Sequence, residues 1–187
     1  ASASTLTETV ILNEDFENGV TASTSPLQDG GFVLDDKAGI DTGYNSSKAL
    51  CPGFVPGKDT TRNEDRTSKY FLPADKIENS EQYCFKFNFY RGLKTSHNWI
   101  RLGPTETTTV LLSELTYGPA QCSAQTWYSI EIKVDLDYDT YSLTVFNTDK
   151  SVRYTTNGSY TYDVVSNISF TIKASNSIVD SSNVSGN

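Results

Sequence analysis

Three side chains that can hold a ligand alternate along one short segment near the middle of the chain. His97, Trp99 and Arg101 are separated by single residues, and Ile100 and Leu102 complete the alternation. In a strand this pattern places the two aliphatic residues in a core and the other three on the solvent side. An exposed indole can stack on the apolar face of a pyranose ring, and a planar guanidinium can donate to hydroxyl groups. The alternative is that a loop covers Trp99.

The preceding segment offers a second set of polar and aromatic side chains. Lys86, Asn88 and Tyr90 alternate with apolar residues, so they also face away from the predicted core. We expect the two segments to pair through a turn at residues 91–96, which would bring Asn88 close to Trp99. Such a platform, flanked by amide and cationic donors, suits a neutral glycan. Three charged residues could extend it or simply be solvated: Glu131, Lys133 and Asp135.

Composition removes several classes of function. The 187 residues carry a net charge of -8, which argues against a nucleic-acid binder with its basic surface. The longest apolar runs are far shorter than a membrane span. With a single histidine, a Ser–His hydrolase or a multi-histidine metal site is not expected. We therefore expect neither nucleic acid nor membrane among the partners.

Period-two alternation dominates the chain and predicts an all-β protein. It is clearest in Tyr83–Tyr90, Ile130–Asp137, Tyr141–Asn147 and Asn167–Lys173. Further strands are predicted at Val10–Phe16, Asn98–Leu102, Val110–Leu115 and Tyr160–Val164. Lys58–Ser80 reads as a long loop with one helical turn at Pro73–Ile77. Many short strands with one apolar face each predict a two-sheet antiparallel β-sandwich.

Three segments together resemble one family group, the jelly-roll carbohydrate-binding modules with a concanavalin-like or family-four-like β-sandwich. Residues 13–19 match an Asn-x-x-Phe-Glu-x-Gly opening strand. The strand Trp127–Asp135 and its hairpin to Asn147 are similar to the Trp-Tyr strand pair of these folds. Residues 168–184 are similar to the closing strand, although Ser181 follows Asp180 where the family pattern has Asp or Asn.

The resemblance implies a non-catalytic module that binds an extracellular polysaccharide, such as plant cell-wall β-glucan or a starch-like glucan. It also implies a structural Ca²⁺ linking the first and last strands, because hard oxygen ligands suit that ion. Glu17 and Asp180 are the pair that the family pattern supplies, and Asn13 or Asp15 would assist them. The predicted glycan ligands are Trp99, Tyr90, Arg101, His97, Asn88 and Lys86.

Two other classes of function remain open. The jelly roll also hosts polysaccharide lyases and glycanases, and His97, Tyr90 and Arg101 could supply a base and a charge neutraliser. The Glu131, Asp135 and Asp137 spacing does not match the strand motif of jelly-roll glucanases, so we expect no enzyme. The third class is an adhesion or protein-interaction domain without a glycan.

The expected context is extracellular. The Ser-, Thr- and Asn-rich composition suits a secreted or surface-attached bacterial protein. We expect a monomeric module of a larger protein, with one domain over residues 1–187, a core at about 9–184 and a short tail at each end. Cys51, Cys84 and Cys122 allow at most one disulfide, and a Cys51–Cys122 bridge stays open.

Overall fold

The computed structural model describes residues 7–42, 48–53, 64–77, 81–92, 97–173 and 177–186, and for 41–42 and 177–186 only the backbone. Strands make up most of the described chain, with two single-turn helices. Their bounds are β1 Thr9–Glu14, α1 Pro26–Asp29, β2 Gly31–Val33, β3 Gly39–Thr42, β4 Lys48–Cys51, β5 Asp65–Phe71, α2 Ala74–Ile77, β6 Gln82–Arg91, β7 His97–Gly103, β8 Val110–Glu114, β9 Trp127–Asp135, β10 Thr140–Phe146, β11 Val152–Ser159, β12 Asn167–Lys173 and β13 Ser177–Gly186.

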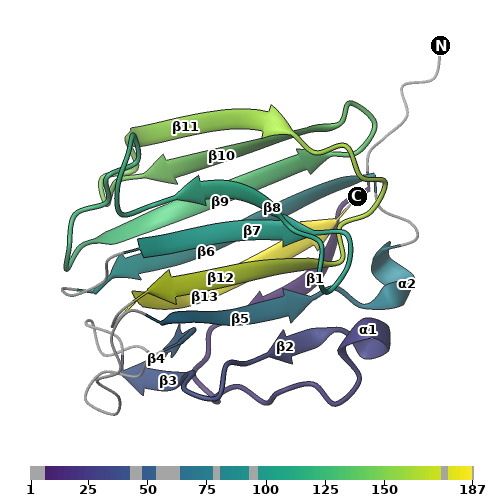
Figure 1. The fold of residues 1–187 in the computed structure, drawn as a ribbon, viewed down its shortest axis with the longest axis horizontal. Helices are drawn as coiled ribbons and strands as arrows, with labels where there is room; N and C mark the ends of the chain where they lie inside the picture. The colour runs from purple at the N-terminus through teal and green to yellow at the C-terminus, as the bar shows by residue number, and fades with distance from the viewer. Residues whose placement is uncertain are drawn as a thin grey trace.

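The strands form two antiparallel sheets that pack face to face (Figure 1). The larger, eight-stranded sheet has the order β11-β10-β9-β6-β13-β4-β3, with β1 also paired to β13. The smaller, five-stranded sheet has the order β2-β5-β12-β7-β8. The two-sheet antiparallel β-sandwich predicted from the alternation, of the jelly-roll type that the resemblance implies, is therefore confirmed. Neither helix in the described part of the chain is long and apolar enough to cross a membrane.

The core lies between the sheets and follows the predicted alternation. Phe85, Phe87 and Phe89 of β6 are buried, as is Phe170 of β12. The rings of Phe87 and Phe170 meet edge to face, with centroids 5.1 Å apart, and so join the two sheets directly. The polar residues between these positions must then face outward, which creates two outer sheet surfaces on which a ligand can bind.

Two predicted elements are wrong. Residues 65–71 form β5, a strand between β2 and β12, rather than part of a long loop; residues 58–63 and 78–80 of that predicted loop lie outside the described chain. The apolar alternation did not reveal this strand because the polar residue Ser68 occupies a core position. Its hydroxyl donates to the carbonyl of Pro52 at 2.6 Å. The predicted strand Tyr160–Val164 is also wrong. These residues are irregular chain that follows β11. The predicted helical turn is confirmed as α2.

The expected hairpin between the segments of Asn88 and Trp99 is also wrong. β6 belongs to the eight-stranded sheet and pairs with β9 and β13, whereas β7 belongs to the five-stranded sheet. The connection between them therefore crosses from one sheet to the other. Local alternation gave the correct face of each strand but carried no information about which strand lies beside it.

Gly103, at the end of β7, makes a close backbone approach that tolerates no side chain. A Cβ there would lie 2.6 Å from the carbonyl oxygen of Thr108 and 3.0 Å from that of Thr105. The buried amide of Asn167 donates to the same Thr105 oxygen at 3.0 Å. Since backbone atoms cannot move aside cheaply, Gly103→Ala should lower the free energy of unfolding by about 1–3 kcal/mol. Urea unfolding would measure the loss, and exposed Thr107→Ala in the same loop should be nearly neutral.

Candidate ligand-binding site

The six predicted ligand residues divide between the two outer surfaces of the sandwich. His97, Trp99 and Arg101 lie together on the outer face of the five-stranded sheet, as their alternation predicted. Lys86, Asn88 and Tyr90 lie on β6, in the other sheet. The structure therefore keeps the two groups apart, on opposite sides of the core.

On the five-stranded sheet, His97, Trp99 and Arg101 form a continuous stack. The imidazole of His97 is parallel to the indole within 10°, with centroids 4.6 Å apart. The guanidinium carbon of Arg101 lies 5.5 Å from the indole centroid. Because these residues flank Trp99 on either side along the strand, they cover the ring from opposite sides. A sugar ring could stack on this indole only after displacing one of them.

Neighbouring strands fix this stack in place. Arg101 donates to the hydroxyl of Thr171 on β12 at 3.1 Å. The ring of Tyr117, which is 57% exposed, meets the imidazole of His97 with centroids 5.2 Å apart. Glu114 of β8 lies opposite Trp99 and has an oxygen 3.9 Å from Nδ1 of His97. The contacts thus account for the orientation of all three stacked residues without a ligand.

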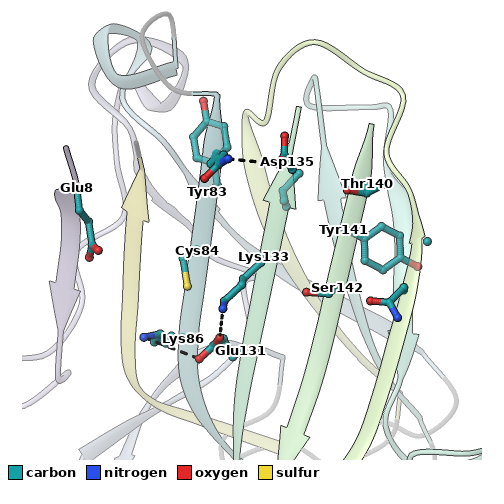
Figure 2. A pocket seen from close by; sticks show the side chains of 14 residues that line it. Glu8, Tyr83, Cys84, Lys86, Glu131, Lys133, Asp135, Thr140, Tyr141 and Ser142 are labelled. Carbon is teal, nitrogen blue, oxygen red and sulfur yellow. Dashed lines mark hydrogen bonds and ion pairs between the residues drawn. The ribbon is translucent and has the colours of Figure 1, made fainter. Parts of the chain in front are cut away.

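The eight-stranded sheet carries an open hollow of about 820 Å³ on its outer face (Figure 2). Strand register sets its lining in rows that run across the strands. One row is Gln82, Asp135 and Thr140; the next is Cys84, Lys133, Ser142 and Asn157; the third begins with Lys86 and Glu131. Glu8, beside β1, closes one side. The floor therefore consists mainly of amide, hydroxyl and charged groups held on four adjacent strands.

The charged groups of the hollow are paired with one another. Figure 2 shows Lys86 and Lys133 converging on Glu131, with N–O distances of 3.8 and 3.2 Å. Gln82 donates to Asp135 at 3.2 Å, and the other carboxylate oxygen of Asp135 accepts from the backbone of Asp137 at 3.0 Å. These contacts orient the polar groups and nearly balance their charge, which favours hydrogen bonding to a neutral ligand.

Cys84 faces the same hollow, between the two lysines. Burial raises the pKa of its thiol, and the carboxylate of Glu131 raises it further, while Lys86 and Lys133 act in the opposite direction. The thiol is therefore protonated at neutral pH and contributes a small, weakly polar surface to the floor rather than a nucleophile.

A second, smaller hollow of about 260 Å³ adjoins the first along the strands. It is lined by Asn88, Ser129 and the half-buried ring of Phe146, and it shares Lys86 and Glu131 with the larger hollow. The hydroxyl of Ser129 donates to Oδ1 of Asn88 at 3.0 Å, which holds the Asn88 amide at the wall of the hollow.

The expectation that Tyr90 is exposed beside Trp99 is wrong. Tyr90 is only 3% exposed and packs with Ala49 and Cys51 of β4. Its ring lies 5.2 Å from that of Trp127 on β9. Tyr90 therefore packs with Trp127 and with β4 in a small apolar cluster of its own. Cys51 belongs to this small cluster and Cys122 to the main core. Both are free thiols, so the Cys51–Cys122 bridge left open above does not form.

The predicted calcium ligands lie around the opening strand. Asn13 of β1 pairs with Asn183 of β13, so the first and last strands are adjacent as expected. Asp15 accepts from the backbone of Glu17 at 2.9 Å, and Glu17 accepts from the backbone of Lys48 at 2.8 Å. The side chain of Asp180 lies outside the described residues. Among the described side chains, no group of three His, Cys, Asp or Glu residues is placed to hold a metal ion. The described carboxylates therefore form no such group, and calcium stays a prediction.

Sequence reasoning missed most of the polar floor. Gln82, Ser142 and Asn157 each occupy an outward position of an alternating strand, as many residues of this chain do. Only the order of β6, β9, β10 and β11 shows that they share one surface. The signal available in the sequence was the outward charged series Glu131, Lys133 and Asp135, which does line the hollow.

Solved structures share the fold across nearly the whole chain. No family model matches the sequence, and no curated protein matches it. Basic winged bean lectin, solved with Tn-antigen, superposes with a TM-score of 0.57 at 10% identity, covering 97% of this chain and 99% of that one. Lectin II from Ulex europaeus gives a TM-score of 0.54 at 10% identity, with 94% and 98% covered. The CBM2 module of the evolved Dit protein of Lactobacillus casei BL23 phage J-1 gives 0.52 at 10% identity, with 96% of each chain covered. The chain therefore has the β-sandwich fold that lectins and carbohydrate-binding modules share.

Proposed function

We propose that the protein is a non-catalytic module that binds a neutral polysaccharide outside the cell, in the hollow on the outer face of the eight-stranded sheet. The observation that carries this proposal is the hollow itself. It has a volume of about 820 Å³, and its floor consists of amide, hydroxyl and charged groups on adjacent strands. Such groups match the hydroxyls of a glycan, and strands hold them with little loss of entropy on binding. The likeness to lectins and to a carbohydrate-binding module supports the same function.

The charge arrangement favours a neutral glycan. The three carboxylates of the hollow, Glu8, Glu131 and Asp135, slightly outnumber its two lysines. The whole chain carries a further negative excess, with a net charge of -8. A polyuronate would be repelled at long range and would have to separate Glu131 from its lysines to bind. Plant cell-wall β-glucan and starch-like glucan remain the proposed ligands.

The spacing of the two carboxylates on β9 supports a binding role over glycoside hydrolysis. Glu131 and Asp135 are four residues apart on one strand, a separation of about 13 Å between backbone positions. Retaining glycosidases need carboxyl groups about 5–5.5 Å apart, and inverting enzymes about 6.5–9.5 Å. The thiol of Cys84, which also lines the hollow, is protonated at neutral pH because burial raises its pKa.

Affinity electrophoresis tests the proposal. The protein should be retarded in gels that contain xyloglucan, cellulose derivatives, xylan or starch, and Asn157→Ala should reduce that retardation. Loss of one hydrogen bond to a neutral group weakens binding by about 0.5–1.5 kcal/mol, roughly twofold to tenfold in Kd. Asn157 is exposed on β11, so its truncation should not alter stability.

The matched control is Asn18→Ala, which removes an exposed amide from the turn after β1. It should leave retardation unchanged. Trp99→Ala tests the stack on the opposite sheet, where we expect a smaller loss because both faces of the indole are already covered. Absence of retardation in every gel would contradict the proposed function. A large loss with Trp99→Ala and none with Asn157→Ala would move the site to the five-stranded sheet.

A further inference from the structure

The two hollows of the eight-stranded sheet share a boundary. Lys86 and Glu131 line both of them, and their ion pair forms the ridge between the two. On one side lies the polar floor around Lys133 and Asn157. On the other side lie Asn88, Ser129 and Phe146. One ligand can therefore contact both hollows only by passing over the ion pair along the strand direction.

The smaller hollow has the groups that a second sugar unit requires. Phe146 pairs with Ser129 across β9 and β10, so its ring and the exposed hydroxyl stand side by side on the outer face. The ring supplies an apolar surface for stacking, and the amide NH₂ of Asn88 supplies a donor. Trp127 lies one row further along the same face, with its indole nitrogen buried and without a hydrogen-bond partner among the described residues.

We infer that the glycan site consists of two subsites joined at the Lys86–Glu131 ion pair, a polar one around Asn157 and an aromatic one at Phe146. This inference rests on the proposed function and adds the length and direction of the ligand. The rows of Lys133 and Ser129 are four residues apart on β9, about 13 Å along the strand. A disaccharide is too short to span both subsites, whereas a hexasaccharide is long enough.

Calorimetric titration with cello- and malto-oligosaccharides of two and six glucose units tests this inference. In whichever of the two series binds, the hexasaccharide should bind at least tenfold more tightly than the disaccharide of the same series. Phe146→Ala should remove most of that gain and leave disaccharide affinity within twofold. Ser129→Ile should have the same effect. It places a β-branched side chain at an exposed strand position and removes no packing.

Leu111→Ala is the matched control, since it removes an exposed apolar side chain from β8 on the other sheet. A separate readout uses the Trp99→Phe background, in which Trp127 is the only tryptophan. Hexasaccharide, but not disaccharide, should then change the tryptophan emission.

The outcomes separate the two proposals. Equal affinity for both lengths, or equal weakening of both by Phe146→Ala, would overturn the two-subsite arrangement and leave glycan binding intact. Binding of neither series, together with no retardation in any polysaccharide gel, would overturn both.

Discussion

Raising the pH from 9 to 11 is expected to destabilise the protein by several kcal/mol, with Cys122 contributing across the whole of this range. Burial raises the pKa of this core thiol from about 9 to about 12, although Arg153 and Arg91 oppose the shift. Burial also raises the pKa of Tyr70 to about 12 and raises that of Tyr160. In each case the folded protein holds a proton that the unfolded chain releases at lower pH.

The direction of the effect follows from linkage. A group whose pKa is raised in the folded state adds stability. This stability is complete below the pKa of the unfolded state and is lost as pH rises toward the pKa of the folded state. For Cys122 the window is pH 9 to 12, and for Tyr70 it is pH 10 to 12. The loss is on the order of 1.4 kcal/mol per pH unit for each group within its window.

Urea unfolding at intervals from pH 7 to 11 measures this loss, and Cys122→Ala isolates the thiol. The variant should start less stable because it leaves a small cavity in the core. The difference between wild type and variant should be constant below pH 8.5 and should shrink above pH 9. Parallel stability curves through pH 11 would contradict the prediction, since the thiol would then titrate alike in both states.

The sequence predicted the fold well because the fold depends on short-range alternation. The inward positions of β6 and β10 were recognised from single apolar faces, and Phe85 and Leu143 are buried as expected. β5 was not recognised as a strand because its core residue Ser68 is polar. A hydrogen bond to Pro52, distant in the sequence, makes the burial of Ser68 favourable. A pattern of residue types contains no record of such long-range compensation.

The candidate site was less predictable because it depends on strand order. His97, Trp99 and Arg101 were correctly placed on one face, since three alternating residues of one strand must share it. Tyr90 was misplaced because β13 and β9, distant in the sequence, flank β6 and leave no room for β7. The polar hollow combines four strands, and none of them carries a distinctive motif by itself.

Glu131→Lys is expected to convert the hollow into a site for anionic polysaccharide. Glu131 is partly buried between Lys86 and Lys133, and it neutralises part of their charge. Its replacement changes the charge of these three residues from +1 to +3 by removing one carboxylate and adding one ammonium. Retardation in polygalacturonate gels should then rise at least tenfold at low ionic strength, and salt should reverse it as the charges are screened.

Glu106→Lys provides the matched control, because it makes the same change in net charge, from -8 to -6, on an exposed loop between β7 and β8. If overall charge alone repels polyuronates, both variants should gain equally. If the paired charges of the hollow set the preference, only Glu131→Lys should gain, and Glu131→Gln should lie between it and wild type. Equal gains would contradict a selective role for the Lys86–Glu131–Lys133 group. A gain restricted to Glu131→Lys would also show that the hollow is open to a polymer, since a polysaccharide must reach these lysines to be retained.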